Sequence, residues 1–329
     1  SWDGYMYAIK AATGEELWRF QTKPQEVSFP NTGSVHVGKV QGVDAVLFGA
    51  AQRFYALNAL TGEELWTFDA GTGCRNGVLD CNYHGERTQI ESSPIIADGK
   101  VFFGMDVDDK ERVESDDPAL AYEGGKGGFY ALDVDTGYMA WFFDLESGQT
   151  CYPDPGDNIT NYDGYHSLEA LGLDLVDPDW FNTRKGCNHP RNRNGCGNVW
   201  SSAAVDVGRS TLYFASSNCD SEAEDVSFRP GPIMPPHDCA ITALTLDGSL
   251  AWTWRPREID NGDLSFGAVP NLFQIQTTTI PGGEAITVDV VGVGSKDGTY
   301  YVMDREGINK RYTEQVVDHR SADFLYWST

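Results

Sequence analysis

Long apolar runs are absent from this sequence. Nowhere do the roughly 20 consecutive apolar residues occur that a helix needs to cross a bilayer, so a helical membrane span is not expected. No secretory leader pattern opens the chain either. The chain begins inside a repeat, at Ser1-Trp2, and ends at Trp327-Ser328-Thr329 without a polar cap. We therefore expect an interior segment of a longer protein.

Positive charge is also scarce. Lys and Arg number 24 against 49 Asp and Glu, which gives a formal net charge of −25. Such a chain repels a phosphate backbone and an anionic membrane surface, so nucleic acid is not an expected partner. The acidity has two interpretations: it keeps an exported protein soluble, or some of the carboxylates gather at a cation site.

None of the seven cysteines lies in the CxxC or CxxCH arrangement of a zinc or haem-attachment motif. Three pairs close short loops: Cys74 with Cys81, Cys187 with Cys196, and Cys219 with Cys239. Cys151 is left over and competes for a partner, so the connectivity stays open. Disulfides predict an oxidising compartment, the periplasm or the cell exterior.

Short strands and tight turns are favoured by what the sequence does contain. Aromatic residues make up 12% of the chain, beside 36 Gly and 15 Pro. Aromatic side chains suit strands, whereas Gly and Pro interrupt long helices and close turns. The composition predicts an all-β protein.

A repeated segment is the strongest signal in the sequence. Each copy has an alternating apolar strand, a turn at Thr-Gly or Asp-Gly, and a second strand that ends in Trp, which is the pattern of a β-hairpin. The copies are YAIKAATGEELW (7–18), YALNALTGEELW (55–66), YALDVDTGYMAW (130–141) and ITALTLDGSLAW (241–252).

Four strands per repeat fit the spacing of these hairpins. Trp18 and Trp66 are 48 residues apart, which is the length of one propeller blade. A second hairpin of the blade is visible at 92–105 and 201–216, and a fifth copy ends at 298–307. We therefore predict a single β-propeller segment over 1–329, incomplete at both ends, with a long loop insertion at about 144–198 and with the tryptophans packed between blades.

The blade pattern resembles the tryptophan-docking repeat of the pyrroloquinoline quinone (PQQ) dependent alcohol dehydrogenases, the quinoproteins, over essentially the whole chain. The Cys-containing stretch 164–202 resembles the branch of PQQ-repeat proteins that includes polyvinyl-alcohol-dehydrogenase-like sequences. The resemblance implies an eight-bladed ring, so further blades would come from the rest of the protein, and it implies PQQ above a Ca²⁺ ion, or a lanthanide in some members.

The metal ligands implied by the resemblance are a Glu, an Asn and an Asp. Asn218 follows Asp206 by twelve residues, as the Asn ligand does. Asp109 follows Pro94 by fifteen residues and stands where the family has Glu; the neighbouring Asp106 and Asp108 are alternatives. When the family pattern is aligned without a gap, the position of the catalytic Asp falls on Ser265. Asp263, two residues upstream, is the nearest carboxylate, and Asp260 is the alternative. A hard cation needs such oxygen ligands.

The cofactor contacts implied by the resemblance are mixed. Lys296 matches the Lys of a K-N-G-x-x-x-V-x-D-R pattern and would contact the quinone. In the family an aromatic residue, the cofactor floor, stacks against PQQ. Its position falls on Ser202 here, and Trp200, two residues away, is the substitute. Glu91 stands where the family has a Thr facing the cofactor, which places an anion beside a tricarboxylate.

Two functions follow from these residues. The first is a PQQ- and Ca²⁺-dependent oxidation of an alcohol with electron transfer to a cytochrome c, with Asp263 or Asp260 as the base. The alternative is a propeller without catalysis that binds proteins or serves as an assembly scaffold. Convergence of Asp109, Asn218, Asp263 and Lys296 at one end of the propeller axis would favour the enzyme.

Overall fold

The computed structural model describes the chain over residues 3–22, 33–70, 74–75, 88–107, 127–145, 148–151, 198–217, 237, 239–256, 264–278, 283–307 and 325–327. These residues form antiparallel sheets, with one short 3₁₀ turn at Val207–Arg209. No helix in the described ranges is long and apolar enough to cross a membrane. The predicted all-β class is confirmed.

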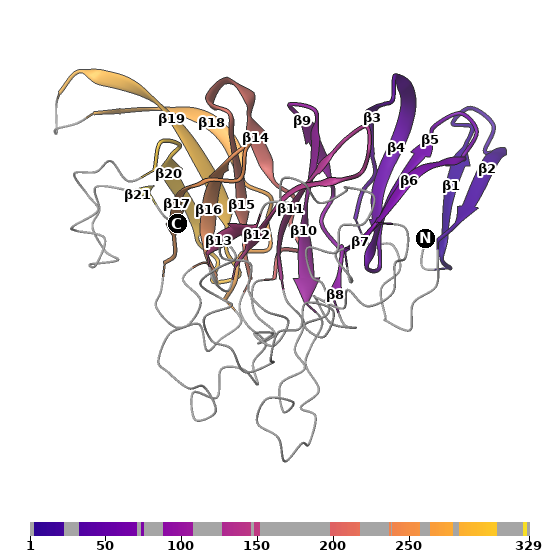
Figure 1. Ribbon diagram of the computed structural model, residues 1–329. Coiled ribbons are helices and arrows are strands. Elements are labelled where there is room, and N and C mark those ends of the chain that lie inside the picture. The colour runs from indigo at the N-terminus through magenta and orange to yellow at the C-terminus, as the bar shows by residue number, and fades with distance from the viewer. Residues whose placement is uncertain are drawn as a thin grey trace, which may run out of the picture.

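Five sheets follow one another along the chain, and we call them blades 1 to 5. They stand side by side in sequence order, from blade 1 at the right of Figure 1 to blade 5 at the left. Blade 1 has two described strands, β1 (Tyr5–Ile9) and β2 (Glu16–Gln21). Blade 2 consists of β3 (His36–Val40), β4 (Val43–Ala50), β5 (Arg53–Asn58), β6 (Glu64–Asp69) and the short β7 (Cys74–Arg75).

The same four-stranded meander continues in the later blades. Blade 3 has β9 (Ile95–Ala97), β10 (Lys100–Val107), β11 (Gly128–Asp133) and β12 (Met139–Asp144), extended by β8 (Thr88–Gln89) and β13 (Gln149–Cys151). Blade 4 has β14 (Ala204–Asp206), β15 (Thr211–Ala215), β16 (Ile241–Thr245) and β17 (Leu250–Trp254). Blade 5 has β18 (Asn271–Thr278), β19 (Ala285–Gly294), β20 (Tyr300–Asp304) and β21 (Leu325–Trp327).

The predicted hairpins are therefore present in the expected places. Each repeat copy forms the third and fourth strands of a blade, and 92–105 and 201–216 form the first and second strands of blades 3 and 4. The first residues of the predicted loop insertion form a strand, because β13 pairs with β12 at the edge of blade 3. The rest of that insertion, 152–197, lies outside the described residues.

The repeat tryptophans join each blade to the next, as predicted. The indole N–H of Trp66 donates to the carbonyl of Val134 at 3.1 Å, and the ring packs on the turn glycine Gly137. A side chain on that glycine would collide with the ring, and its φ of 70° also favours Gly. The other three seams repeat this contact, with indole donors Trp18, Trp141 and Trp252 and acceptors Ala59, Leu246 and Arg305.

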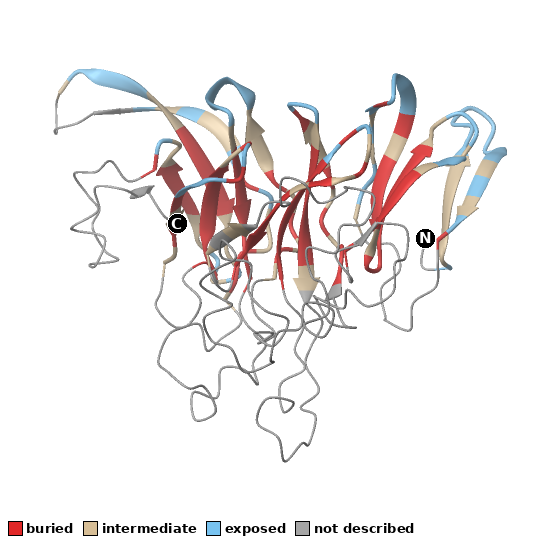
Figure 2. Cartoon of the chain, in the orientation of Figure 1, coloured by how far each residue is buried: buried red, intermediate tan, exposed pale blue. Residues whose placement is uncertain are grey.

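Apolar clusters fill the space between neighbouring blades. Phe54 of blade 2 stacks on Phe103 of blade 3 with ring centroids 4.4 Å apart, and Phe129 of blade 3 stacks on Phe214 of blade 4 at 4.6 Å. Successive side chains of a strand point to opposite faces of the sheet, so Phe103 of β10 packs toward blade 2 and its neighbour Phe102 packs toward blade 4. One strand therefore contributes to two seams. Figure 2 shows the result: buried residues occupy the middle of blades 2 to 5, and the turns at the upper ends are exposed.

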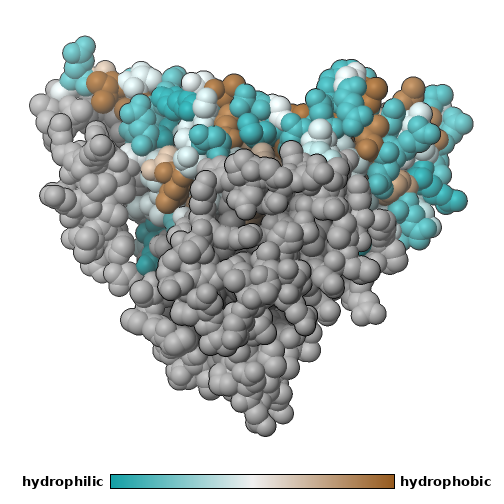
Figure 3. Space-filling view, in the orientation of Figure 1, coloured by the Kyte–Doolittle hydropathy of each residue, from teal (hydrophilic) through white to brown (hydrophobic). Residues whose placement is uncertain are grey.

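On the face shown in Figure 3, the exposed upper turns carry both polar and apolar side chains. Apolar side chains there are scattered, as the isolated brown residues among the hydrophilic ones in Figure 3 show. The most exposed are Leu60 at 85%, Val207 at 67% and Val37 at 62%, which lie on different turns and strands. Scattered exposed apolar residues are ordinary on a protein surface.

Candidate functional site

The strand register identifies equivalent positions in three blades. Each carbonyl that accepts a tryptophan N–H, at Val134, Leu246 and Arg305, directly follows a residue of the third strand of its blade. That third-strand residue pairs with the second strand of the same blade: Asp133 with Lys100, Thr245 with Thr211, and Asp304 with Val290. Six residues further along each of these second strands the chain reaches the end of the blade from which the first strand starts. We call this end of the blades the inner rim. Its equivalent positions in blades 3, 4 and 5 are Asp106, Ser217 and Lys296.

A chain of serine contacts runs along the same rim. The backbone N–H of Ser34 donates to Ser93 Oγ at 2.8 Å, and the N–H of Ser93 donates to Ser202 Oγ at 2.9 Å. Each serine lies two residues before the first strand of its blade, in blades 2, 3 and 4. We call these contacts the serine clasps. The hydroxyl of Ser202, placed by the sequence at the cofactor floor, accepts a bond that joins blade 3 to blade 4.

Trp200 and Glu91 occupy a second pair of equivalent positions, two residues before the clasp serines Ser202 and Ser93. Trp200 is half-buried, and its indole N–H donates to Ser217 Oγ. The ring lies against Gly267 of blade 5, where a Cβ would stand 2.5 Å from the indole. Only glycine permits this close approach, so the ring bridges blades 4 and 5 at the rim.

Lys296 is brought to the same ring. Its Nζ lies 5.9 Å from the centroid of the Trp200 indole, within the range of a cation–π contact. The backbone N–H of Lys296 donates to the carbonyl of Ser265 at 2.9 Å, and Ser295 Oγ donates to the carbonyl of Leu264 at 2.8 Å. Trp200, Ser217 and Lys296, up to 96 residues apart in sequence, thus form one cluster.

Several predicted site residues lie outside the described residues: Asp109, Asn218, Asp260 and Asp263. The described neighbour of Asn218 is Ser217, which contacts Trp200, and the described neighbour of Asp263 is Leu264, which contacts Ser295. Their ligand roles stay predictions. Ser265, the gapless position of the catalytic Asp, is fully buried, and in the described part of the chain its hydroxyl has no hydrogen-bond partner.

Glu91 lies in a polar group of its own. Its carboxylate Oε1 accepts a hydrogen bond from Gln89 Nε2 at 3.0 Å. Gln89 is almost completely buried at 3% exposure. The predicted position of Glu91 beside the cofactor stays a prediction, and the structure adds a buried amide partner that no spacing pattern indicated.

The predicted disulfides are not tested by the described residues. Cys74 begins β7 and Cys239 is buried, whereas Cys81, Cys187, Cys196 and Cys219 fall outside the description. Within the described ranges no group of three or more His, Cys, Asp or Glu side chains is placed to hold a metal ion. The pairing of the cysteines remains a prediction.

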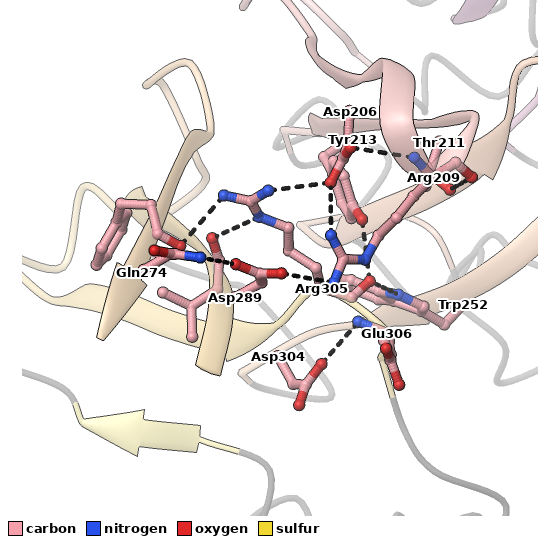
Figure 4. A network of polar contacts seen from close by, with 12 residues as sticks. Asp206, Arg209, Thr211, Tyr213, Trp252, Gln274, Asp289, Asp304, Arg305 and Glu306 are labelled. Carbon is pink, nitrogen blue, oxygen red and sulfur yellow. Dashed lines mark hydrogen bonds and ion pairs between the residues drawn. The ribbon is translucent and has the colours of Figure 1, made fainter. Parts of the chain in front are cut away.

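At the end of the blades opposite the inner rim, a charged network joins blades 4 and 5 (Figure 4). Arg305 Nη1 lies 3.0 Å from Asp206 Oδ2, and Arg209 bridges Asp206 at 3.1 Å and Asp289 at 2.6 Å. Arg305 also donates to the carbonyls of Val290 and Phe273. Sequence reasoning used Asp206 only to measure spacing and missed this network, whose members lie as far as 99 residues apart.

The network fixes the charge state of its members. Burial opposes ionisation of Asp206, but hydrogen bonds from Arg305 and Arg209 outweigh it and hold the pKa of Asp206 below the usual range. Burial, helped by the nearby Asp206 carboxylate, raises the pKa of Tyr213 to about 12. Tyr213 therefore stays protonated and donates its O–H to the Arg305 carbonyl at 3.0 Å.

Comparison with known proteins agrees with this architecture. The family model described as glucose/ethanol/alcohol dehydrogenase, β-propeller domain (PQQ), matches residues 2–170. Quinohemoprotein alcohol dehydrogenase ADH IIB of Pseudomonas putida is 26% identical over 301 residues, which are 91% of this chain and 36% of the relative. The chain thus spans well under half the length of this relative.

Solved structures show the same fold. Quinohemoprotein alcohol dehydrogenase from Comamonas testosteroni superposes with a TM-score of 0.56 at 22% identity, over 92% of this chain and 38% of that one. A europium-containing methanol dehydrogenase gives a TM-score of 0.53 at 19% identity, over 92% and 46% of the two chains. Since the family match covers more than half of the 329 residues, the chain belongs to the quinoprotein glucose, ethanol and alcohol dehydrogenase β-propellers that carry the PQQ repeat.

Proposed function

We propose that this protein is a PQQ-dependent alcohol dehydrogenase that requires Ca²⁺ and passes electrons to a cytochrome c outside the cytoplasm. The observation that carries the proposal is the cluster of Trp200, Ser217 and Lys296 at the inner rim. A flat aromatic face beside a fixed cation fits a planar, anionic cofactor, since the indole offers stacking area and the ammonium offers a point charge. PQQ, when bound, supplies hydride acceptance.

The chain's own residues have separate roles in this proposal. Trp200 is the stacking platform in place of Ser202, because the Ser202 hydroxyl is used by the clasp from blade 3. Lys296 contacts the quinone oxygens. Asp109, Asn218 and Asp263 provide oxygen ligands to the cation. Asp263 or Asp260 accepts the proton of the substrate hydroxyl while the carbinol carbon loses hydride.

The other propositions follow from the same reading of the chain. Cys74 pairs with Cys81 and Cys187 with Cys196, with Cys219 and Cys239 as a third pair, in an oxidising compartment. The whole of 1–329 is one propeller segment that is completed by further blades. The acidic surface, at −25 overall, would favour a cytochrome with a basic docking face.

Titration of PQQ tests this function. The purified protein, loaded with Ca²⁺, is titrated with PQQ while tryptophan fluorescence is followed, and dye-linked alcohol oxidation is measured in parallel. Trp200→Ala and Lys296→Ala are expected to weaken PQQ binding at least tenfold, and Asn218→Ala to abolish Ca²⁺ binding together with activity. Lys39→Ala is the matched control, because Lys39 is an exposed lysine on β3 whose ion pair with Asp44 lies on the surface.

One observation favours the scaffold alternative. Glu91 places a carboxylate two residues before a clasp serine, at the position that Trp200 takes in the next blade. An anion there repels a cofactor that carries three carboxylates. If the wild type binds no PQQ, or binds it equally well with Trp200→Ala and Lys296→Ala, the protein is a propeller without catalysis and its rim serves protein binding.

A further inference from the structure

The first hairpin of blade 5 extends beyond the strands that follow it. β18 and β19 pair without a break as far as Thr278 with Ala285, whereas β20 pairs with β19 only from Val290 onward. Residues 274–278 and 285–289 therefore form a two-stranded extension, which we call the arm. It reaches past the rest of blade 5 at the upper left of Figure 1.

The arm is held in shape by polar contacts along one of its faces. Arg209 of blade 4 lies 2.6 Å from Asp289 Oδ2, and Gln274 Nε2 donates to Asp289 Oδ1 at 2.8 Å. Further out, Gln276 Nε2 donates to Thr287 Oγ1 at 2.6 Å. These cross-strand bonds fix the arm before any partner arrives, which lowers the cost of ordering it on binding.

One edge of the arm offers backbone groups to a further strand. The carbonyl of Asp289 accepts the N–H of Arg305 at 3.1 Å on the side of β20. Since the backbone groups of successive residues point to alternate sides of a strand, Ala285 and Thr287 present their N–H and C=O groups to that same side. Among the described residues no strand pairs with 285–288 there.

This edge also lacks the charges that keep free strand edges apart. Neither 274–278 nor 285–288 contains a charged residue. By contrast β3, the edge strand of blade 2, carries Lys39 in an exposed ion pair with Asp44. Charges on an edge oppose pairing with another chain, and their absence permits it. On a chain with a net charge of −25, the arm is a neutral place at which a second copy can approach.

A neighbouring blade would not supply the missing strand. Each ladder in the described part of the chain joins strands of one blade, and neighbouring blades meet through ring stacking and tryptophan contacts. A blade thus presents a face to its neighbour, and a face does not pair with an open edge. An identical edge, running antiparallel, does pair with it and closes a symmetric dimer.

We propose that the arm pairs with the arm of a second copy across a two-fold axis and forms one four-stranded sheet. The axis passes at Ile286, which is 42% exposed, so the two Ile286 side chains meet as a non-hydrogen-bonded pair with Cβ atoms about 4.5–5.5 Å apart. Ala285 of each copy then exchanges backbone hydrogen bonds with Thr287 of the other. Glu284 lies opposite Val288, so no like charges face each other. This dimer goes beyond the proposed function and does not depend on it.

Sedimentation of the protein at rising concentration, without PQQ or Ca²⁺, measures the association. The contact is small, so a weak dimer is expected. Ile286→Lys brings two ammonium groups together at the axis and is expected to weaken the association at least tenfold. Leu60→Lys is the matched control, because Leu60 is an apolar side chain on a turn of blade 2 with 85% exposure, and it should change nothing.

Cross-linking tests the register. Ile286→Cys is expected to give a disulfide-linked dimer under mild oxidation, because the axis brings the two Cβ atoms close to disulfide range. Thr287→Cys is the control on the opposite face of the same strand, where Ala285 of the other copy stands opposite, and it should not cross-link. The wild type under the same oxidation gives the background from the native cysteines.

The outcomes decide between the arm and other contacts. A dimer that Ile286→Lys weakens and Ile286→Cys cross-links supports the arm. A monomer at every concentration overturns the proposal and leaves the arm to a neighbouring blade. A dimer that persists in Ile286→Lys, or that cross-links equally in Thr287→Cys, uses another surface and also overturns it. None of these results affects the PQQ titration, so the two proposals fail separately.

Discussion

The outer seams of the propeller and its inner rim are built on the same repeat, but they use it differently. At every seam a tryptophan indole donates to a carbonyl of the next blade over a turn glycine. At the rim the backbone positions are equivalent while the side chains change: Asp106, Ser217 and Lys296 in one row, Glu91 and Trp200 in another. Contacts that assemble the ring are repeated from blade to blade, whereas the rim side chains that we propose for ligand binding are not.

The largest expected effect belongs to a complete seam. Trp141 is 1% exposed, and Trp141→Ala should destabilise the protein by about 3–5 kcal/mol, since it leaves a cavity and an unpaired carbonyl at Leu246. Trp18, on the two described strands of blade 1, is only half-buried, and Trp18→Ala should cost less than half as much. Urea unfolding measures both. Equal losses would show that the seams do not depend on burial.

The charged seam between blades 4 and 5 should be nearly as sensitive. Arg305 and Asp206 side chains are only 13% and 10% exposed, so Arg305→Met removes one of the two arginine partners of a buried carboxylate, leaves Arg209, and should cost about 2 kcal/mol. The exposed pair of Lys39 and Asp44 provides the contrast, and Lys39→Met should change stability by less than about 1 kcal/mol. Comparable losses for the two variants would refute the importance of burial at this seam.

Acid should weaken the contact between blades 3 and 4 through His237. Burial lowers the pKa of His237 to about 4, against about 6.5 unfolded. The unfolded state therefore binds more protons between these values, and stability falls as the pH falls from 6.5 toward 4. From pH 7 to pH 5 the loss should be about 2 kcal/mol. His237→Phe should be less pH-dependent by that amount; an identical pH profile would contradict the assignment.

The smallest effect separates the clasp from the stacking platform. Ser202→Ala removes the acceptor for the Ser93 N–H and should cost about 1 kcal/mol, with PQQ affinity unchanged. Trp200→Ala should do the opposite, with a modest change in stability and a large one in binding. Unfolding curves and PQQ titrations of both variants check this. Loss of PQQ binding in Ser202→Ala would show that Ser202, and not Trp200, contacts the cofactor.

Sequence patterns predicted the fold well because its determinants are local. The strand, the turn glycine and the tryptophan of each repeat lie within twelve residues, so Trp66 and its hairpin could be recognised directly. The rim was predicted less completely. Lys296 and Trp200 were found through a family resemblance, but the clasp of Ser202 with Ser93 and the pair of Arg305 with Asp206 join residues about 100 positions apart, and no local pattern encodes such a meeting.

The serine clasps have a direction, and that direction ends at blade 4. Each clasp hydroxyl receives the N–H of the blade before it, yet the corresponding position of blade 5 is Val269, two residues before β18, which has no hydroxyl. The seam that lacks this neutral fastening is the one held by Arg209 and Arg305. Ionic strength should therefore act unevenly on the ring: salt should weaken the seam between blades 4 and 5 more than the other seams, at the end of the blades away from Trp200 and Lys296.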